Sequence, residues 1–338
     1  MPNIFHDHDL GTSSFLITGG AGFIGSHIAE YLLKNGAGKV RVLDNMTNGF
    51  ETNIEILRQY PAFEFTEGDI RDIEICRKAC DGIHYVSHQA AVGSVPRSIK
   101  EPSYTNDVNV GGFVNILKAA VENNIRQFVY ASSSAVYGDE LTLPKKEEKT
   151  GNCLSPYAVS KKANELYAEV FTRIFHIPVI GFRYFNIFGP RQHPFGPYAA
   201  VIPLFVTAIK NNSPVYINGD GNQTRDFTFV ENAVQVNIKG MLVTGDEAKN
   251  KVYNVAVGEN YSINYLFNRI REYFGSNEEP VYLEPREGDV RNSLADISQA
   301  QSLLGYTPVT KFDSGLIKTI EFFKSLGDQK EQNIKINI

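Results

Sequence analysis

Ser14-Phe15-Leu16-Ile17-Thr18-Gly19-Gly20-Ala21-Gly22-Phe23-Ile24-Gly25 joins a short apolar run to a glycine-rich turn. The apolar run has the length and composition of a buried β-strand. Residues 26–35 have helical periodicity, and Gly36 stands where a helix should end. Residues 39–43 are predicted to form a second strand, which ends at Asp44. This order of elements is typical of a dinucleotide-binding Rossmann fold.

The glycine turn predicts a cofactor site. Glycines let the backbone approach a pyrophosphate, which would lie at the N-terminus of the following helix. The residues expected to contact it are Gly19, Gly22, Phe23, Ile24 and Gly25. Asp44, nineteen residues after Gly25, could accept both ribose hydroxyls of NAD and would repel the 2′-phosphate of NADP. We therefore expect NAD. The alternatives are a βα turn without a ligand and a solvated acid at the end of a strand.

A tyrosine and a lysine lie four residues apart in the segment 155–161. On a helix Tyr157 and Lys161 share one face, and the lysine charge would lower the pKa of the phenol. Tyr157 could then act as a base near neutral pH. This spacing also occurs by chance on surface helices. It indicates a catalytic pair here only because the glycine turn and the serine run 132–134 accompany it. That run follows an apolar segment, 127–131, and parallel strands carry chemistry at their carboxyl ends.

The glycine turn, the serine run and the tyrosine–lysine pair, in this order, resemble the extended short-chain dehydrogenase/reductase family over nearly the whole chain. The resemblance implies an α/β fold, a doubly wound parallel-sheet Rossmann domain with a smaller α/β substrate-binding domain. We expect residues 1–185 plus about 230–265 to bind NAD. Residues of about 186–229 plus 266–338 would bind a UDP-sugar. The catalytic serine of the family, counted back from Tyr137-Gly138, falls on Ser133, which joins Tyr157 and Lys161.

The resemblance implies further contacts to NAD. Asp69 and Ile70 would lie along the adenine, although a plain turn at a strand end is an alternative reading. Residues 89–91 would contact the cofactor through their backbone, and Tyr184 would line the nicotinamide side. The full set beyond the glycine turn is Asp44, Asn45, Asp69, Ile70, Gln89, Ala90, Ala91, Tyr157, Lys161 and Tyr184.

The second half resembles the nucleotide-sugar half of the sugar epimerases. Arginine forks suit a diphosphate, and Arg191, Arg225 and Arg286 stand out in an acidic chain, with surface ion pairs as the alternative. The resemblance assigns the UDP diphosphate to Arg225 and Arg286, the uridine ribose to Asp289 and the uracil to Tyr216. The full set of expected substrate contacts is Gly93, Ser94, Ser133, Ser134, Tyr157, Asn186, Ala200, Val201, Tyr216, Arg225, Arg286, Asp289 and Ser293.

Two local features bear on the reaction. The resembled sugar 4,6-dehydratases carry an Asp-Glu pair after the catalytic hydroxyl residue, whereas this chain has Ser134-Ala135. Ser293 occupies the family's gate position, where members restricted to UDP-glucose and UDP-galactose carry a tyrosine and members that accept N-acetyl sugars carry a small residue. The chain most resembles bacterial UDP-N-acetylglucosamine 4-epimerases, of the kind that feed surface polysaccharide synthesis.

The resemblance implies reversible C4 epimerisation of UDP-N-acetylglucosamine to UDP-N-acetylgalactosamine. The reaction would pass through a 4-keto intermediate with tightly bound NAD, and UDP-glucose and UDP-galactose are a further candidate pair. One alternative is a UDP-N-acetylglucosaminuronate 4-epimerase, with Arg97 as a cation near the sugar C6. An alternative of a different class is an inactive dinucleotide-binding sensor or scaffold, against which the intact set Ser133, Tyr157 and Lys161 argues.

Composition limits the partners. The chain has 338 residues and a formal net charge of −5, without a run of lysines and arginines, which argues against nucleic acid. We also expect no membrane span, no signal peptide and, since the three cysteines lack a zinc spacing, no metal and a cytoplasmic location.

Three further expectations concern the shape of the chain. We expect a homodimer, because an apolar stripe at Tyr167, Val170, Phe171 and Ile174, together with the helix of Phe113, resembles the family's two-helix dimer face. Core packing is the alternative for that stripe. Residues 1–13 are expected to form a loose arm, and residues 104–123 one long helix.

Overall fold

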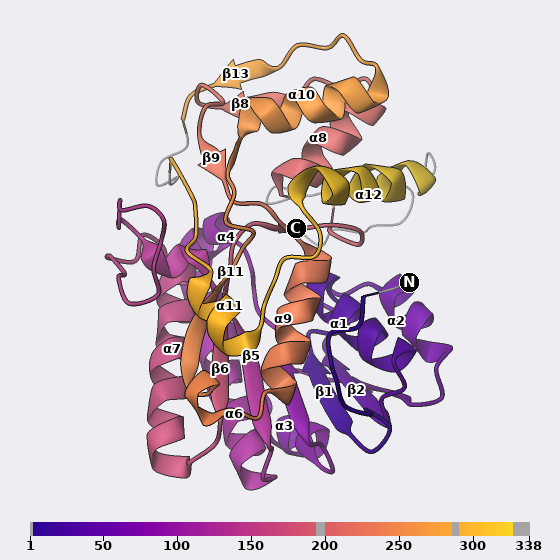
Figure 1. The fold of residues 1–338 in the computed structure, drawn as a ribbon, viewed down its shortest axis with the longest axis vertical. Helices are drawn as coiled ribbons and strands as arrows, with labels where there is room; N and C mark the ends of the chain where they lie inside the picture. The colour runs from indigo at the N-terminus through magenta and orange to yellow at the C-terminus, as the bar shows by residue number, and fades with distance from the viewer. Residues whose placement is uncertain (1–2, 194–199, 286–290, 327–338) are drawn as a thin grey trace.

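A parallel sheet of seven strands lies at the centre of the larger part of the protein (Figure 1). The computed structural model describes residues 3–193, 200–285 and 291–326. The strands are β1 (Ser14–Thr18), β2 (Lys39–Asp44), β3 (Phe63–Glu67), β4 (Tyr85–His88), β5 (Gln127–Ser133), β6 (Val179–Tyr184) and β11 (Lys251–Val255). Their order is β11-β6-β5-β4-β1-β2-β3. The order reverses between β1 and β4, which is where open α/β sheets bind ligands.

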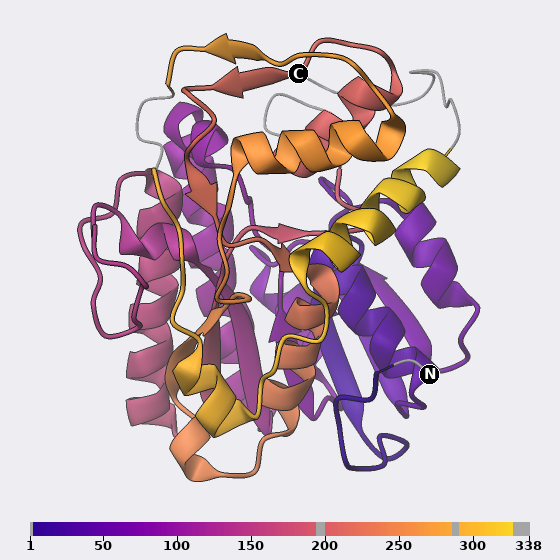
Figure 2. The same cartoon turned by 45° about the horizontal axis from the view of Figure 1, so that its top comes forward.

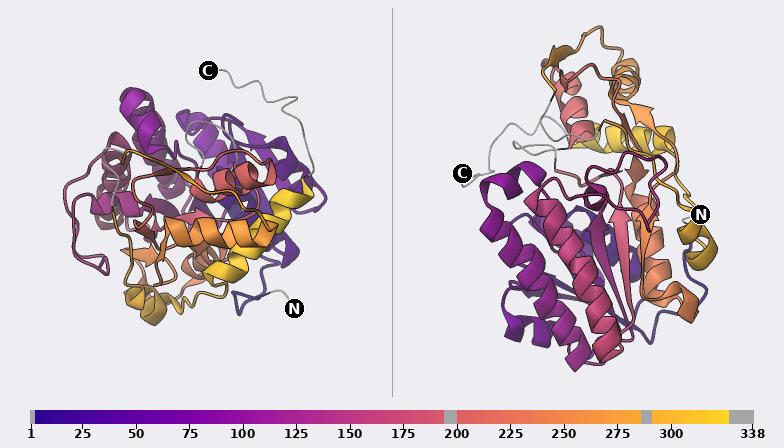
Figure 3. Two further views of the ribbon diagram at one scale, coloured as in Figure 1. Left: turned by 90° about the horizontal axis from the view of Figure 1, so that it is seen from above. Right: turned by 90° about the vertical axis from the view of Figure 1, so that its left-hand side faces the viewer.

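Helices cover both faces of this sheet. One face carries α1 (Phe23–Lys34), α2 (Glu51–Arg58), α9 (Val230–Leu242) and α11 (Ser298–Leu304). The other face carries α3 (Ile73–Cys80), α6 (Gly112–Glu122) and α7 (Pro156–Phe175), which run side by side in Figure 3. Each face therefore has its own buried apolar cluster, and the expected doubly wound Rossmann fold is confirmed.

A smaller aromatic core lies beyond the sheet, at the top of Figure 1 and in front in Figure 2. It is built from α8 (Val201–Lys210), α10 (Ile263–Phe274) and α12 (Phe312–Ser325) with three strand pairs. The pairs are β7 (Ile187–Phe188) with β10 (Thr228–Phe229), β9 (Thr224–Arg225) with β12 (Tyr261–Ser262), and β8 (Tyr216–Asn218) with β13 (Val281–Leu283). Since α11 packs with the large sheet, the exact division of the chain into two domains stays a prediction.

The expected long helix at 104–123 is interrupted. The chain forms α4 (Val95–Lys100), α5 (Pro102–Asn106), a π-helical turn (Asp107–Gly111) and then α6. The wide turn places the buried Asn109 against the loop after β4, where its side chain accepts from the Val92 amide at 2.7 Å. Its amide group also donates to the hydroxyl of Ser160 on α7 at 3.1 Å. Asn109 thus joins three segments, which a regular helix would not reach.

The expectation of a loose N-terminal arm is wrong for residues 3–13. Phe5 and Leu10 are buried, and the Phe5 ring stacks on Tyr31 of α1 with 5.2 Å between the ring centres. The Phe5 amide donates to the Tyr31 hydroxyl at 2.7 Å, and the Leu10 carbonyl accepts from Gly38. Two apolar side chains therefore anchor an otherwise polar segment. Within the described ranges, no helix is long and apolar enough to span a membrane.

Candidate active site

A cavity of about 940 Å³ runs past the carboxyl ends of the strands. The predicted site residues that line it are Gly19, Gly22, Phe23, Ile24, Gly25, Asp44, Asn45, Asp69, Ile70, Gln89, Ala90, Ala91, Gly93, Ser133, Ser134, Tyr157, Lys161, Tyr184, Asn186, Arg225 and Ser293. Ser94, Ala200, Val201 and Tyr216 are not among its lining residues. Arg286 and Asp289 lie outside the described residues. The roles predicted for all these residues stay predictions.

The glycine turn has the shape that a pyrophosphate site needs. A Cβ atom on Gly25 would lie 2.3 Å from the Gly19 carbonyl oxygen, so the turn closes only because this atom is missing. Gly19 has a φ of +69°, which favours glycine. Since Gly22, at the N-cap of α1, has no side chain, the first amides of the helix are left for an anion. The turn therefore fits the diphosphate of a dinucleotide.

Asp44 is held in place by the backbone. Its carboxylate accepts hydrogen bonds from the amides of Ala21 at 3.0 Å and Met46 at 2.9 Å, and burial raises its pKa. A carboxylate has further acceptor sites, which leaves capacity for ribose hydroxyls. The next cation along this edge, Arg71, is paired with Asp69, and this pairing holds the pKa of Asp69 at about 2. Because the charge of Arg71 is already neutralised by Asp69, Arg71 is poorly suited to bind the 2′-phosphate of NADP, and the site fits NAD better.

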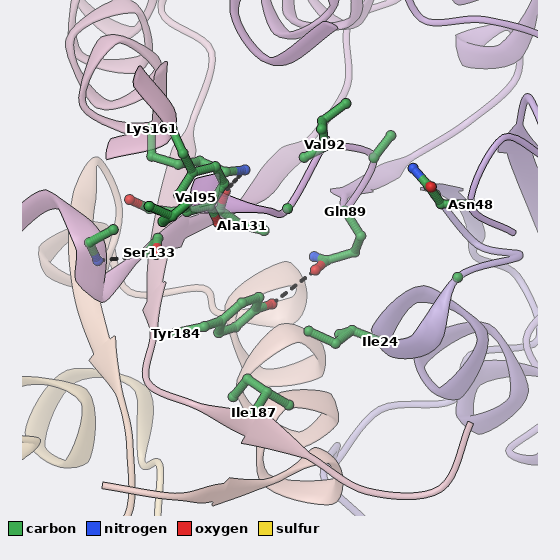
Figure 4. Close-up of a pocket in the computed structure, with 18 of the residues that line it drawn as sticks. Ile24, Asn48, Gln89, Val92, Val95, Ala131, Ser133, Lys161, Tyr184 and Ile187 are labelled. Atoms are coloured by element: carbon green, nitrogen blue, oxygen red, sulfur yellow. Dashed lines mark hydrogen bonds between the residues drawn. The ribbon is translucent and has the colours of Figure 1, made fainter. Parts of the chain in front are cut away.

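Ser133, Tyr157 and Lys161 meet at one end of the cavity. β5 ends at Ser133, and α7 begins beside it with Ser155 as N-cap, accepting from the Ala158 amide at 3.1 Å. The first turns of α7 bring Tyr157 and Lys161 to the cavity wall, where Figure 4 draws the hydrogen bond from Lys161 to Ala131, on the strand that ends at Ser133. The helix spacing predicted from the sequence is present.

The electrostatics of the pair differ from the expectation. Burial raises the pKa of Tyr157, and a hydrogen bond with Ser133 acts in the opposite direction. Burial lowers the pKa of Lys161 to about 8. The predicted lowering of the phenol pKa by Lys161 is therefore wrong for the protein alone, because burial of the phenol is the largest effect and the opposing one comes from Ser133.

A cluster of amides and hydroxyls that the sequence does not reveal fixes Tyr184. The Tyr184 hydroxyl accepts from Asn237 of α9 at 2.6 Å and donates to Gln89 at 3.2 Å. Figure 4 draws the bond to Gln89. Asn237 is fully buried and also accepts from Ser87 at 3.0 Å. Because α9 also contains other polar residues, among them Asn232 and Gln235, no local pattern marks Asn237.

Behind the serine run lies a buried ion pair. Glu165 of α7 accepts from Arg183 of β6 at 2.8 and 2.9 Å, and from Ser132 at 2.7 Å. The Arg183 guanidinium also covers the Tyr137 ring, 4.9 Å from its centre. This network joins α7, β6 and the turn after β5, and so fixes the distance between Ser133 and Tyr157.

Asp226 anchors the substrate side of the cavity. Its carboxylate accepts from the amides of Val257, Gly258 and Ala295 at 3.0 to 3.3 Å, and burial raises its pKa to about 6. The segment that it holds includes Ser293, whose amide donates to the Thr224 carbonyl at 3.1 Å. Ser293, the predicted gate residue, is thus part of a fixed wall.

Arg191 and Arg97 each form an ion pair with a glutamate. Arg191 pairs with Glu30 of α1, so the ion-pair alternative applies to it. Arg97 pairs with Glu101 at 3.1 Å and lies over the Tyr104 ring. The suggested role of Arg97 as a cation at the sugar C6 receives no support from these contacts.

Comparison with known proteins identifies the family. Residues 15–256 match the model of the NAD dependent epimerase/dehydratase family. The chain belongs to this family. It is therefore an enzyme, and NAD is its cofactor.

Individual relatives narrow the class of reaction. A UDP-glucose 4-epimerase of Mycolicibacterium smegmatis is 34% identical over 92% of this chain and 98% of its own. A UDP-N-acetylglucosamine 4-epimerase of Methanobrevibacter ruminantium, solved with UDP-N-acetylmuramic acid, is 37% identical with a TM-score of 0.88 over 93% of this chain and 99% of its own. A UDP-glucuronic acid 4-epimerase of Bacillus cereus, solved with NAD, is 29% identical with a TM-score of 0.87 over 93% and 100%. The enzyme is thus an isomerase of the UDP-sugar 4-epimerase class.

Proposed function

We propose that this 4-epimerase interconverts UDP-N-acetylglucosamine and UDP-N-acetylgalactosamine. The observation that carries the choice of sugar is Ser293, a small side chain that lines the cavity on a well-anchored segment. An acetamido group needs volume, and a bulky residue there would fill it. The likeness to the Methanobrevibacter ruminantium enzyme supports this choice.

The residues at the end of β5 and the start of α7 supply the proton chemistry. Tyr157 takes the proton from the sugar 4-hydroxyl, and Ser133 hydrogen-bonds to the same oxygen. Lys161 holds positive charge beside the phenol, and its ammonium group is oriented by the Ala131 carbonyl at 2.8 Å. NAD, when bound, would supply a hydride acceptor and donor and would leave the reaction unchanged overall, so that it serves as a cofactor and not as a co-substrate. Burial of this end of the cavity excludes water from the 4-keto intermediate.

Residues of the substrate side hold the nucleotide. We assign the diphosphate to Arg225, which lines the cavity on β9, the strand that pairs with β12. Its guanidinium donates to the carbonyls of Thr224 and Arg291 at 2.9 and 3.1 Å. A guanidinium group has five donors in a planar fork, whose geometry suits the oxygens of a diphosphate.

The two alternative functions, a uronate epimerase and an inactive sensor, have less support. The uronate alternative needs a cation at the sugar C6, and Arg97 is bound to Glu101 instead. The Bacillus cereus neighbour still makes a uronate substrate the second candidate. An inactive sensor does not fit a chain that belongs to a family of enzymes.

A cytoplasmic homodimer completes the proposal. Val159, Leu166 and Ile174 of α7 are each more than half exposed and lie along one side of the helix. Such a stripe on a long helix suits a second copy of the chain. Phe113, which the sequence suggested for the same face, is instead fully buried in the core.

Incubation with three substrates tests the choice of sugar. Purified protein is mixed separately with UDP-N-acetylglucosamine, UDP-glucose and UDP-N-acetylglucosaminuronate, and the galacto products are quantified by proton NMR. We expect the highest kcat/KM with UDP-N-acetylglucosamine. A higher value with either of the other two sugars would refute the proposed preference.

A further inference from the structure

The segment Gly189–His193 crosses from the aromatic core to the cofactor half of the protein. It follows β7, which begins at Ile187 on the wall of the cavity in Figure 4. Two residues turn the backbone sharply, since Gly189 has a φ of +154° and Arg191 a φ of +66°. A positive φ is strained for arginine, so contacts of the surrounding residues must hold this conformation.

The segment is fastened to α1, the helix that follows the glycine turn. Nε2 of His27 hydrogen-bonds to the Pro190 carbonyl at 3.0 Å, and because a carbonyl only accepts, the imidazole donates. Burial lowers the pKa of His27 to about 4, so the ring is neutral at physiological pH. The Arg191 guanidinium pairs with Glu30 and donates to Ser26 at 3.4 Å. The side chains of Arg191 and Glu30 are 12% and 13% exposed.

A second attachment reaches the loop after β2. The ring of His193 stacks on Phe50, with 5.0 Å between centres and 20° between planes. Phe50 is the N-cap residue of α2, and its amide donates to the Ala21 carbonyl in the glycine turn at 3.0 Å. The segment therefore spans the space between α1 and the loop at residues 45–50.

Gln192 and His193 line the same cavity as the residues expected to hold the cofactor. Gly22 and Phe23 border it at the turn, and Asn48 and Gly49 border it at the loop after β2. We infer that residues 190–193, held by Glu30, His27 and Phe50, form a clasp over the bound NAD and slow its release. Slow release has a use, because the hydride taken from C4 must return from the same cofactor molecule.

The inference rests on NAD as the cofactor and not on which sugar is epimerised. It therefore stands or falls separately from the proposed substrate. Arg191, His193 and Phe50 act as positioning residues, since their contacts are with protein groups. The test must accordingly measure the release of NAD and not turnover alone.

The experiment compares NAD release from the parent protein with release from Arg191→Met and His193→Ala. Protein loaded with NAD is diluted into buffer that contains an NAD-degrading enzyme, and NAD still bound is measured after denaturation at successive times. We expect release to be about tenfold faster in each variant, the change that about 1.4 kcal/mol produces. Turnover of the variants should also become dependent on added NAD.

Arg41→Met is the matched control. Arg41 of β2 pairs with Glu64 at 2.8 Å, its side chain is 15% exposed, and it is not among the residues that line the cavity. A general loss of stability in the cofactor half would therefore speed release in Arg41→Met as well, and that result would overturn the inference. Parent-like release rates in both Arg191→Met and His193→Ala would do the same.

A double-mutant cycle separates the two attachments. Phe50→Ala combined with His193→Ala removes both partners of one stack, so its effect should be smaller than the sum of the single effects. Glu30→Gln combined with His193→Ala affects both attachments, and these effects should add. Full additivity in the Phe50 and His193 pair would show that the stack itself does not hold the clasp.

Discussion

The Lys161 ammonium group donates to the Ala131 carbonyl at 2.8 Å and lies 6.0 Å from the centre of the Tyr157 ring. The carbonyl at the end of β5 thus orients the lysine, and the phenol is oriented separately by Ser133. Burial moves the two pKa values in opposite directions, up for Tyr157 and down to about 8 for Lys161. Both groups therefore respond strongly to charge that a ligand brings into the cavity.

Tyr157→Phe should lower kcat by about 10²–10⁴-fold, the usual contribution of a positioned acid–base group. The change removes the hydroxyl and keeps the ring, so the affinity for UDP should stay within about twofold. The measurements are kcat by NMR and Kd for UDP by calorimetry. Tyr167→Phe, at an exposed position of the same helix, is the control and should behave as the parent does. Near-normal turnover in Tyr157→Phe would disprove its role as the base.

The sequence predicts well those helices, strands and turns whose formation depends on residues close to one another along the chain. The strand before Gly19, the turn and α1 follow from local composition, as does the helix that presents Tyr157 and Lys161. β11 lies within residues 230–265, which were expected to belong to the NAD-binding domain, and it pairs with β6. These signals decide the fold and the place of the cavity.

The features that the sequence does not predict depend on partners far along the chain. Asn109 breaks its helix because Val92 and Ser160 offer hydrogen bonds. Asn237 belongs to the site through Tyr184, and the pKa of Tyr157 depends on burial. Neither the partner of a polar side chain nor its burial can be read from spacing alone.

Glu165→Gln should lower the free energy of unfolding by about 3 kcal/mol, since it leaves the Arg183 charge buried without its partner. Arg183 and Glu165 are 2% and 7% exposed, so water cannot reach and solvate the unpaired guanidinium group. Urea-induced unfolding measures the change. Glu51→Gln breaks a surface pair with Arg58 in which both side chains are 52% exposed, and it should cost less than about 1 kcal/mol. Equal effects of the two substitutions would contradict the importance of the buried network.

Asp226 gives stability an unusual dependence on pH. Burial raises its pKa from 3.8 to about 6, so between these values the folded protein holds a proton that the unfolded chain has lost. The contribution of Asp226 to the free energy of unfolding is therefore highest at low pH. It falls by about 3 kcal/mol in total as the pH rises through this window.

Asp226→Asn should remove this dependence. The difference in unfolding free energy between parent and variant is expected to shift by about 3 kcal/mol in favour of the parent on going from pH 7 to pH 4. The difference should be constant above about pH 7, where the carboxylate is ionised in both states. Denaturant unfolding of both proteins across this range provides the measurement. A difference independent of pH would show that Asp226 titrates normally in the folded protein.

Ser293→Tyr should exclude the N-acetylated sugars while some activity on UDP-glucose remains. Ser293 lines the cavity, and its backbone amide donates a hydrogen bond to the Thr224 carbonyl. The wall therefore cannot easily move away from a larger side chain. Overpacking a filled site costs about 1–3 kcal/mol, which corresponds to a loss of about 5- to 150-fold in kcat/KM for UDP-N-acetylglucosamine. The values of kcat/KM for both substrates in both proteins measure the effect. Ser302→Tyr, at an exposed position of α11, controls for the added tyrosine. If Ser293→Tyr processes UDP-N-acetylglucosamine as well as the parent does, the acetamido group lies against another part of the cavity and Ser293 does not select the sugar.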